Sequence, residues 1–263
     1  MPDLLHVSRD DRGVHRVTIR RPDVRNALNG QAFRELAEIC GQVGADRGAR
    51  ALLLTGQGKA FSAGGDFEAL QELLDGDRRL AVDELSNANR AITALVELEV
   101  PTVAALNGDA FGGGAAVALA ADFRIMAADA RLGFVFARLG LSGADTGATW
   151  WLSRLLGPVK AFEILSLGRV YTAEEACAAG LVTQVATPSE FETSVEEFLT
   201  RLAGLAPLAV SGTKRALAGI EARSMAEQFD LEAEIQADVI GSADFREGLA
   251  AFRERRAAKF EGA

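Results

Sequence analysis

Short apolar runs alternate with helical patterns over the first two hundred residues. Residues 50–55 and 101–106 are apolar runs that end in Gly56 and in Asn107, which is typical of buried strands that enter loops. Residues 14–20 instead alternate polar and apolar side chains with a period of two, which predicts a strand near the surface. Because strands and helices alternate, the pattern favours an α/β fold.

Apolar residues between these strands recur at helical spacing. They predict helices over residues 31–43, with Asn29 as the N-cap, and over residues 87–98 and 148–156. After Thr187, a predicted capping residue followed by Pro188 at the first helical position, the helical pattern continues almost unbroken.

The C-terminal part changes character, because no strand pattern follows about Pro207 and helices reach Phe260. The last predicted helix, about residues 244–260, carries one stripe that would pack on its own chain or on a neighbouring subunit. The stripe consists of Phe245, Leu249, Phe252 and Arg256.

Composition narrows the class of protein. The chain has 263 residues, 49% of them hydrophobic, so it buries a large core without disulfide or metal staples. Cys40 and Cys177 form no CxxC pair, which indicates a reduced, cytoplasmic chain with two small core thiols. A net charge of −9 argues against a nucleic-acid partner. With no signal-peptide pattern and no apolar run of about 18 residues, we expect no membrane partner.

Several common sites are excluded by their spacing. The dinucleotide-binding pattern GxGxxG does not start at Gly56, because Phe61 stands where its third glycine belongs. The Walker phosphate-binding pattern GxxxxGK does not end at Lys59, because Leu53 stands where its first glycine belongs. His6 and His15 are the only histidines and lie in or beside a strand pattern, so we expect no histidine triad and no metal site.

Two glycine-rich segments remain, residues 58–67 (GKAFSAGGDF) and 107–116 (NGDAFGGGAA), each after a predicted buried strand. Glycine lets a ligand approach peptide N–H groups, and a loop that opens a helix points those donors outward. Two such segments would flank one oxygen that becomes an anion, as in acyl transfer or enolate chemistry. The alternative is that the glycines only permit tight turns.

With residues 25–28 (RNAL), these segments resemble the enoyl-CoA hydratase/isomerase family, also called crotonases. Residues 121–125, 168–182 and 247–252 follow in family order, so the resemblance covers nearly the whole chain. It implies a spiral of ββα turns that forms an acyl-CoA-binding core over residues 1–200. It also implies a helical region over residues 201–263 that mediates trimerisation, often as a dimer of trimers.

The resemblance implies an acyl-CoA thioester as substrate, with no separate cofactor because coenzyme A is part of the substrate. The implied reactions are hydration or double-bond isomerisation of an enoyl-CoA in fatty acid metabolism, and the arginine-rich composition fits a bacterial genome. By position, Gly65 and Gly113 donate backbone N–H groups to the thioester oxygen. Arg25, Ala27, Leu28, Ala63 and Asp66 line the coenzyme A path. Phe252 and Arg255 reach a neighbouring subunit's coenzyme A, or only pack at the interface.

The chain departs from family hydratases at two positions, where Ala116 and Phe136 stand in place of two glutamates. Hydration needs carboxylates to activate water and to protonate the α-carbon, and neither residue does this. Isomerisation, hydrolysis, decarboxylation or a silent acyl-CoA-binding subunit are therefore kept as alternatives.

Asp145 is the candidate replacement, in a loop over residues 140–150 that runs into a predicted helix. It is similar in place to the catalytic aspartate of family isomerases, and apolar neighbours would raise its pKa. Its alternative role is to cap the following helix. Asp109 is a weaker candidate for the catalytic carboxylate, and Glu68 is expected at the rim of the substrate site.

The acyl group is not specified by the sequence. Aromatic residues near the predicted turns would line the site for a bulky acyl chain, or are core residues. These residues are Phe67, Phe111, Phe134, Phe136, Trp150 and Trp151, and Leu141 is also expected to line the substrate site.

Overall fold

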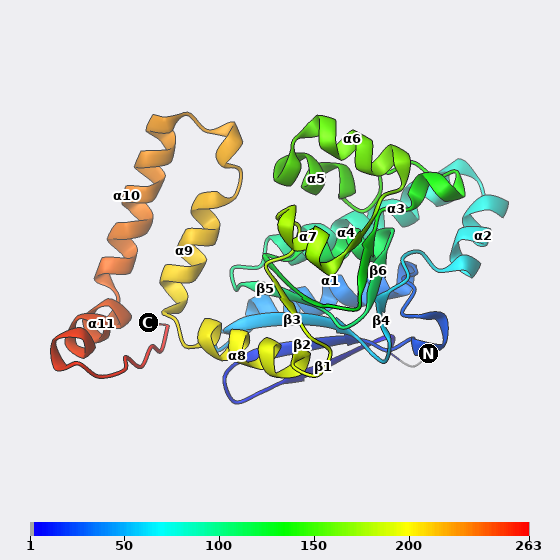
Figure 1. The fold of residues 1–263 in the computed structure, drawn as a ribbon. Helices are drawn as coiled ribbons and strands as arrows, with labels where there is room; N and C mark the ends of the chain where they lie inside the picture. Colours follow the sequence, from blue (N-terminus) through cyan, green and yellow to red (C-terminus); the bar gives the residue numbers. More distant parts are fainter. Residues whose placement is uncertain (1–2, 263) are drawn as a thin grey trace.

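The computed structural model describes residues 3–262 and contains two sheets (Figure 1). The larger sheet has the order β1-β2-β3-β5-β7-β10, and the smaller has the order β4-β6-β8-β9. The strands are β1 (Leu5–Arg9), β2 (Val14–Ile19), β3 (Ala51–Gly56), β4 (Ala60–Ser62), β5 (Thr102–Leu106), β6 (Asp109–Phe111), β7 (Phe123–Ala127), β8 (Arg131–Gly133), β9 (Val170–Thr172) and β10 (Gln184–Ala186).

Successive turns of a spiral build both sheets. Each turn adds a strand to the large sheet (β3, β5, β7), then a strand to the small sheet (β4, β6, β8), and then helices, and the strands of each set pair in parallel. The helices that follow are α2 (Phe67–Asp75), α3 (Arg78–Val96), α4 (Gly113–Ala120), η2 (Phe136–Leu139), α5 (Ala148–Leu156) and α6 (Pro158–Leu167). This arrangement confirms the α/β spiral of ββα turns.

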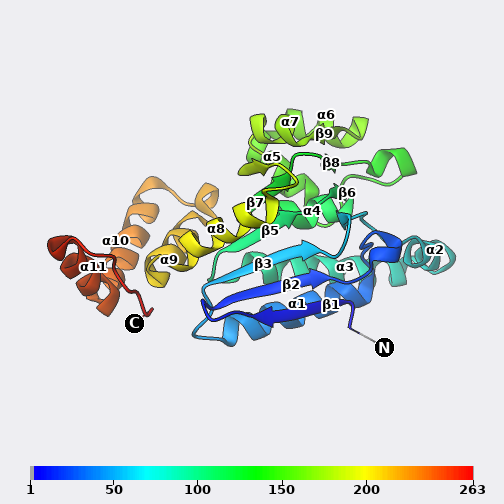
Figure 2. The same ribbon diagram turned by 60° about the horizontal axis from the view of Figure 1, so that its bottom comes forward.

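Helices cover the large sheet. Helix α1 (Gly30–Ala45) packs on α3, and Figure 2 shows both beneath the sheet. Helix α8 (Phe191–Ala203) contacts β3 and β7, where Phe123 and Phe198 meet edge to face with ring centroids 5.1 Å apart. Asn29 caps α1 as predicted, because its side chain accepts a hydrogen bond from the Ala32 amide at 3.0 Å.

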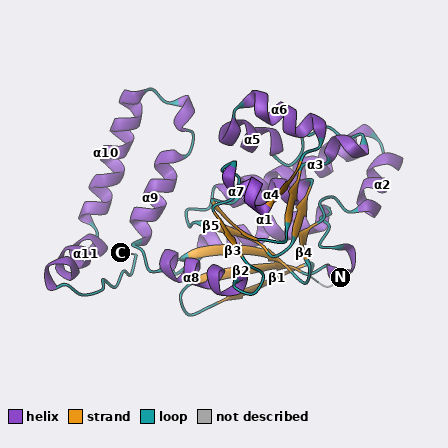
Figure 3. Cartoon of the chain, viewed as in Figure 1, coloured by secondary structure: helices purple, strands orange, loops and turns teal. Residues whose placement is uncertain are grey.

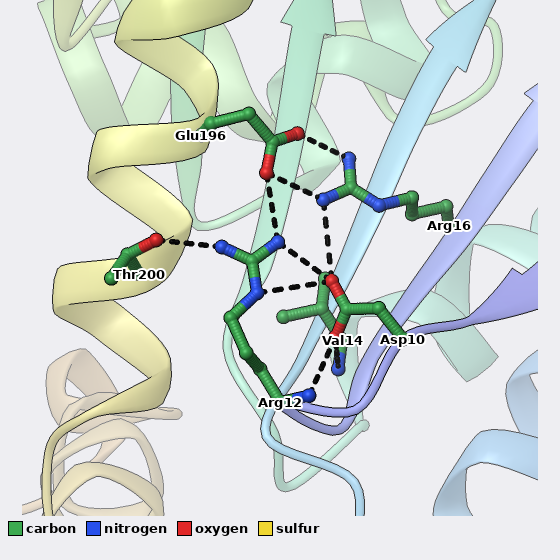
Figure 4. Close-up of polar contacts among 6 residues, drawn as sticks. All are labelled: Asp10, Arg12, Val14, Arg16, Glu196 and Thr200. Carbon is green, nitrogen blue, oxygen red and sulfur yellow. Dashed lines mark hydrogen bonds and ion pairs between the residues drawn. The ribbon is translucent and has the colours of Figure 1, made fainter.

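Four charged side chains tie α8 to β2 and to the turn before β2 (Figure 4). Arg12, in the turn between β1 and β2, bonds Asp10 at 2.6 Å and Glu196 of α8 at 2.8 Å. Arg16 of β2 pairs with Glu196 at 2.7 Å, and Thr200 accepts a hydrogen bond from Arg12 at 2.6 Å. Burial raises the pKa of Asp10, but hydrogen bonds from Arg12 and the Val14 amide outweigh it and lower that pKa to about 2.

The C-terminal helices extend away from the sheets as an arm (Figures 1 and 3). Lys214 joins the arm to the body through Asp122 at 2.8 Å, and Glu221 does so through Arg154 of α5 at 2.8 Å. The arm consists of α9 (Pro207–Leu217), η3 (Ile220–Ala222), α10 (Met225–Gly241) and α11 (Ala243–Glu254). The predicted division after residue 200 falls within α8. The remaining short helices are η1 (Pro22–Val24) and α7 (Ala173–Ala178).

Three local expectations were wrong. Helix α8 begins at Phe191 with Glu190 as N-cap, because the Thr187 hydroxyl donates to the Glu190 carboxylate instead of capping a helix. Helix α11 ends at Glu254 rather than Phe260, since Arg255 adopts the left-handed conformation with φ 57°. Cys40 is buried as expected, but Cys177 is exposed, and both thiols are free.

No helix within residues 3–262 has both the length and the apolar character that a membrane crossing requires.

The Asp10 contacts predict a pH-dependent stability. Because the folded pKa lies below the unfolded value near 3.8, the stabilisation is present above pH 4 and is lost as pH falls toward 2. We expect Asp10→Asn to lower the free energy of unfolding at pH 7 by about 1 kcal/mol or less, since the group is partly exposed. Urea denaturation of both proteins from pH 7 to pH 2 measures the difference, which should shrink with the pH. Asp11→Asn is the control, and a difference that stays constant with pH would contradict the prediction.

Candidate active site

A cavity of about 380 Å³ lies where the two glycine-rich segments meet the N-terminal halves of α1 and α3 and part of α2. It brings together Gly65, Gly113 and Asp145, the three predicted catalytic positions. Its other walls are Arg21, Leu28, Asn29, Gly30, Gln31, Phe33, Arg34, Asp66, Glu68, Ala69, Leu70, Glu72, Leu73, Leu80, Glu84, Leu85, Ala88 and Thr146.

The two glycine turns adjoin because β4 pairs in parallel with β6, so both strands end at the same edge of the small sheet. Gly64 has φ +96°, and a Cβ there would lie 2.7 Å from the Phe111 carbonyl oxygen. Only glycine fits this turn, because both the backbone conformation and the space exclude a side chain. A Cβ placed on Gly113 would lie 4.0 Å from the Gly65 nitrogen, so the two amides flank one small volume.

Both amides are available to a ligand. Leu28 and Gly65 form a parallel bridge in which the Leu28 amide bonds the Gly64 carbonyl and the Asp66 amide bonds the Leu28 carbonyl. This pattern leaves the Gly65 N–H pointing away from the bridge. Gly113 is the first residue of α4, where an N–H has no partner inside the helix. Both glycines line the cavity.

Asp145 lines the same cavity, in the loop before α5. Its carboxylate accepts a hydrogen bond from the Thr146 hydroxyl at 2.9 Å, and Thr146 has φ 49°. A Cβ on Gly113 would be 3.6 Å from the Thr146 hydroxyl oxygen, which places this pair beside the amides. Burial raises the pKa of Asp145, and the Thr146 hydrogen bond opposes that rise.

The alternative role of Asp145 as a helix cap was wrong. The N-cap of α5 is Gly147, and no side chain caps it. Only the backbone carbonyl of Asp145 takes part, accepting from the Ala148 amide at 2.9 Å. The carboxylate thus lines the cavity without capping α5.

Asp66 has the opposite electrostatic environment to Asp145. It caps α2 by accepting hydrogen bonds from the Glu68 and Ala69 amides, and Arg21 pairs with it at 2.6 Å. Burial alone raises its pKa, but the Ala69 amide and the Arg21 guanidinium outweigh burial and lower that pKa. Asp66 is a structural anion of the cavity wall rather than a proton carrier.

The remaining predicted residues lie around the cavity or away from it. Leu28 and Asp66 line it, whereas Ala116 and Phe136, at the positions of the family glutamates, are buried and do not. The other predicted residues lie outside the lining of the cavity: Arg25, Ala27, Ala63, Phe67, Phe111, Leu141, Phe252 and Arg255. Among them, Phe67, Leu141 and Phe252 have exposed side chains. Asp109 pairs with Arg131 at 2.7 Å outside the cavity, and Glu68 lines it as expected.

The aromatic residues do not form one acyl site. Phe134 and Phe136 are buried core residues, and Trp150 is 60% exposed beneath Arg154. Phe33 is the aromatic residue among the walls named above.

Three important residues were missed by the sequence reasoning. Asn26 is fully buried, and its side chain binds the Gln57 and Ala60 carbonyls, which holds the segment before Leu28 in place. Arg21 pairs with Asp66, which the fold brings close from a distant part of the chain. Thr146 donates a hydrogen bond to its neighbour Asp145 within the loop before α5. An Asn within RNAL was the available signal for Asn26, while nothing local marks Arg21.

Within residues 3–262, no group of three or more His, Cys, Asp or Glu side chains is arranged to hold a metal ion.

Comparison with known proteins agrees with this geometry. Residues 9–263 match the sequence model of the enoyl-CoA hydratase/isomerase family. The chain is 33% identical over 259 residues to 1,2-epoxyphenylacetyl-CoA isomerase of Escherichia coli, covering 97% of this chain and 98% of that protein. It is 33% identical to short-chain-enoyl-CoA hydratase of Clostridium acetobutylicum, covering 94% and 92% of the two chains.

A solved structure is equally similar. The crystal structure of enoyl-CoA hydratase from Bacillus anthracis superposes with a TM-score of 0.92 at 30% identity, covering 99% of this chain and 100% of that one. With a family match over nearly all of its length and the same fold, this chain belongs to the enoyl-CoA hydratase/isomerase family.

Proposed function

We propose that the protein shifts the double bond of an enoyl-CoA, with Asp145 as the proton carrier and the Gly65 and Gly113 amides as the oxyanion hole. The observation that carries the proposal is that the half-buried Asp145 carboxylate, with its raised pKa, lines the same cavity as Gly65 and Gly113.

The proposed reaction begins with a 3-enoyl thioester. The Asp145 carboxylate removes a proton from the α-carbon, and the electron pair moves into the thioester oxygen as a dienolate, which the two N–H groups stabilise. The protonated Asp145 then returns its proton to the γ-carbon, and the double bond lies between the α- and β-carbons. No atom is gained or lost, so one carboxylate suffices.

The raised pKa of Asp145 suits this role. A base with a higher pKa takes a carbon-bound proton more readily, and its protonated form survives long enough to return it. Thr146 orients the carboxylate without neutralising it, because its hydroxyl is an uncharged donor. Asp66, with its lowered pKa and its ion pair, lacks these properties.

Hydration is the second candidate. The cavity is open to water, and Glu68, Glu72 and Glu84 line it besides Asp145. With Ala116 and Phe136 buried outside the cavity lining, a hydration reaction would have to orient its water on one of these glutamates.

We also propose assembly through the C-terminal arm, as a trimer or a dimer of trimers. The arm leaves large apolar side chains in water, which supports contact with another copy. They include Met225, Phe229, Ile240, Phe245, Leu249 and Phe252, with Phe252 84% exposed. Whether Phe252 and Arg255 reach the coenzyme A of a neighbouring subunit belongs to the same proposal.

The activity is tested by incubating the purified protein with straight-chain and aromatic enoyl-CoAs, followed by chromatography and mass spectrometry. We expect a product of equal mass with a shifted retention time, and loss of turnover by about 10² to 10⁴ in Asp145→Asn. A gain of one water would indicate hydration, release of coenzyme A hydrolysis, and loss of carbon dioxide decarboxylation. Binding without any change across the panel would indicate a silent subunit, and full activity of Asp145→Asn would exclude the proton role.

Gly113→Pro tests the oxyanion hole. Proline at the first residue of a helix is tolerated, so α4 should form while one N–H donor is lost. We expect kcat/KM to fall by about 10² to 10³ with the melting temperature little changed. Circular dichroism and acyl-CoA binding serve as folding controls. A folded variant with undiminished kcat/KM would show that this amide does not stabilise the transition state.

Thr146→Val tests the control of the Asp145 pKa. Valine keeps the β-branched shape but removes the donor, so the charged form loses a hydrogen bond and the pKa of Asp145 should rise further. The acidic limb of the pH–rate profile should therefore move to higher pH, and ¹³C NMR of the Asp145 carboxyl should show the same shift. A limb at unchanged or lower pH would refute the assignment.

A further inference from the structure

Ser62 carries a fully buried hydroxyl at the end of β4 that takes no direct part in the proposed reaction. Its Oγ donates a hydrogen bond to the Asn26 carbonyl at 2.8 Å and accepts one from the Gly64 amide at 3.2 Å. The hydroxyl therefore joins the main chain of two segments that lie far apart in the sequence. Buried polar groups with such partners hold their surroundings in one arrangement.

The first glycine turn depends on bonds of this kind. Gly64 has φ +96°, and glycine has access to many backbone conformations, so the turn does not hold itself. The Leu28 amide donates to the Gly64 carbonyl at 2.7 Å, and that carbonyl shares one planar peptide with the Gly65 N–H. Ser62 holds the peptide on the other side of Gly64. With both peptides held, the Gly65 N–H keeps its direction.

The acceptor of the Ser62 hydroxyl is itself fixed. Asn26 is fully buried, and its side chain donates to the Gln57 carbonyl at 2.9 Å and to the Ala60 carbonyl at 2.7 Å. The Asn26 carbonyl is thus a rigid point to which Ser62 ties the turn.

Ser62 also lies directly against the second glycine turn. A Cβ placed on Gly114 would lie 2.6 Å from both Cβ and Oγ of Ser62, so the first turn of α4 rests on this side chain. Gly113 is the residue before Gly114 and begins the same helix. One serine therefore contacts both segments that carry the amides of the proposed oxyanion hole.

We propose that Ser62 is a positioning residue that sets the direction and the separation of the Gly65 and Gly113 amides. It does not line the cavity, so it acts through Gly64 and Gly114 rather than on the substrate. A small displacement of such donors is costly, because they stabilise the transition state only where its charge develops. The inference rests on the proposed oxyanion hole and adds the residue that orders it.

Ser62→Ala tests the inference, because it removes the hydroxyl and little else. We expect kcat to fall by about tenfold to a hundredfold, with KM little changed. The second readout is the infrared spectrum of bound octanoyl-CoA labelled with ¹³C at the thioester carbonyl, which requires no turnover. Strong hydrogen bonds lower the carbonyl stretching frequency below that of the free thioester in water. Ser62→Ala should lose about half of that lowering or more, since the two amides no longer converge.

Thr102→Val is the matched control. The Thr102 hydroxyl is equally buried, donates to the Asp122 carboxylate and accepts from the Asp122 amide, both at 2.9 Å, and does not line the cavity. Its removal should lower the melting temperature as Ser62→Ala does, but leave kcat and the carbonyl frequency at their wild-type values. If Ser62→Ala does not fold, Ser62→Cys, whose thiol is a weaker hydrogen-bonding group, takes its place in both measurements.

The outcomes separate this inference from the proposed function. A wild-type carbonyl frequency that is lowered, but equally so in Ser62→Ala, overturns the inference and leaves the oxyanion hole in place. An equal loss of the lowering in Thr102→Val also overturns it, since the effect would then be general destabilisation. No lowering in the wild-type protein overturns the inference together with the oxyanion hole. Loss of the lowering in Ser62→Ala alone, without turnover of any enoyl-CoA by the wild-type protein, supports the inference and overturns the proposed reaction.

Discussion

Parallel pairing of two three-residue strands, β4 with β6, is the constraint on which the site depends. It brings together two turns that are about fifty residues apart in the chain and aims one free amide from each at the same volume. The pairing requires glycine at position 64, because a Cβ there would press on the Phe111 carbonyl at 2.7 Å. The large sheet, the helices on its faces and the buried Asn26 all support this short edge.

Two carboxylates of the cavity wall, Asp66 and Asp145, lie in opposite electrostatic environments. Two amides and Arg21 stabilise the charge of Asp66, whereas the half-buried Asp145 carboxylate has one neutral side-chain donor, the Thr146 hydroxyl, which does not outweigh burial. Their pKa values move apart for these reasons, one downward and one upward. The surroundings of each carboxylate thus separate the two pKa values without any change of residue type.

Charge also organises the surface of the body. The network of Asp10, Arg12, Arg16 and Glu196 fixes α8 on the sheet, and α8 leads directly into the arm. The arm itself touches the body through a few ion pairs and leaves its apolar side chains in water. The anchoring of α8 therefore sets where the arm presents its apolar surface.

The sequence by itself determined the class of fold, the strands near residues 14–20, 50–55 and 101–106, the cap at Asn29 and both glycine turns. These features depend on local periodicity and on glycine's missing side chain. It also pointed to Asp145, but it left a helix cap and a catalytic group as alternatives. The tertiary structure ruled out the cap, since the N-cap of α5 is Gly147 and no side chain caps this helix. The ion pair of Arg21 with Asp66 was equally hidden, because it joins residues more than forty positions apart. A pattern along the chain carries no information about which distant side chains share a cavity.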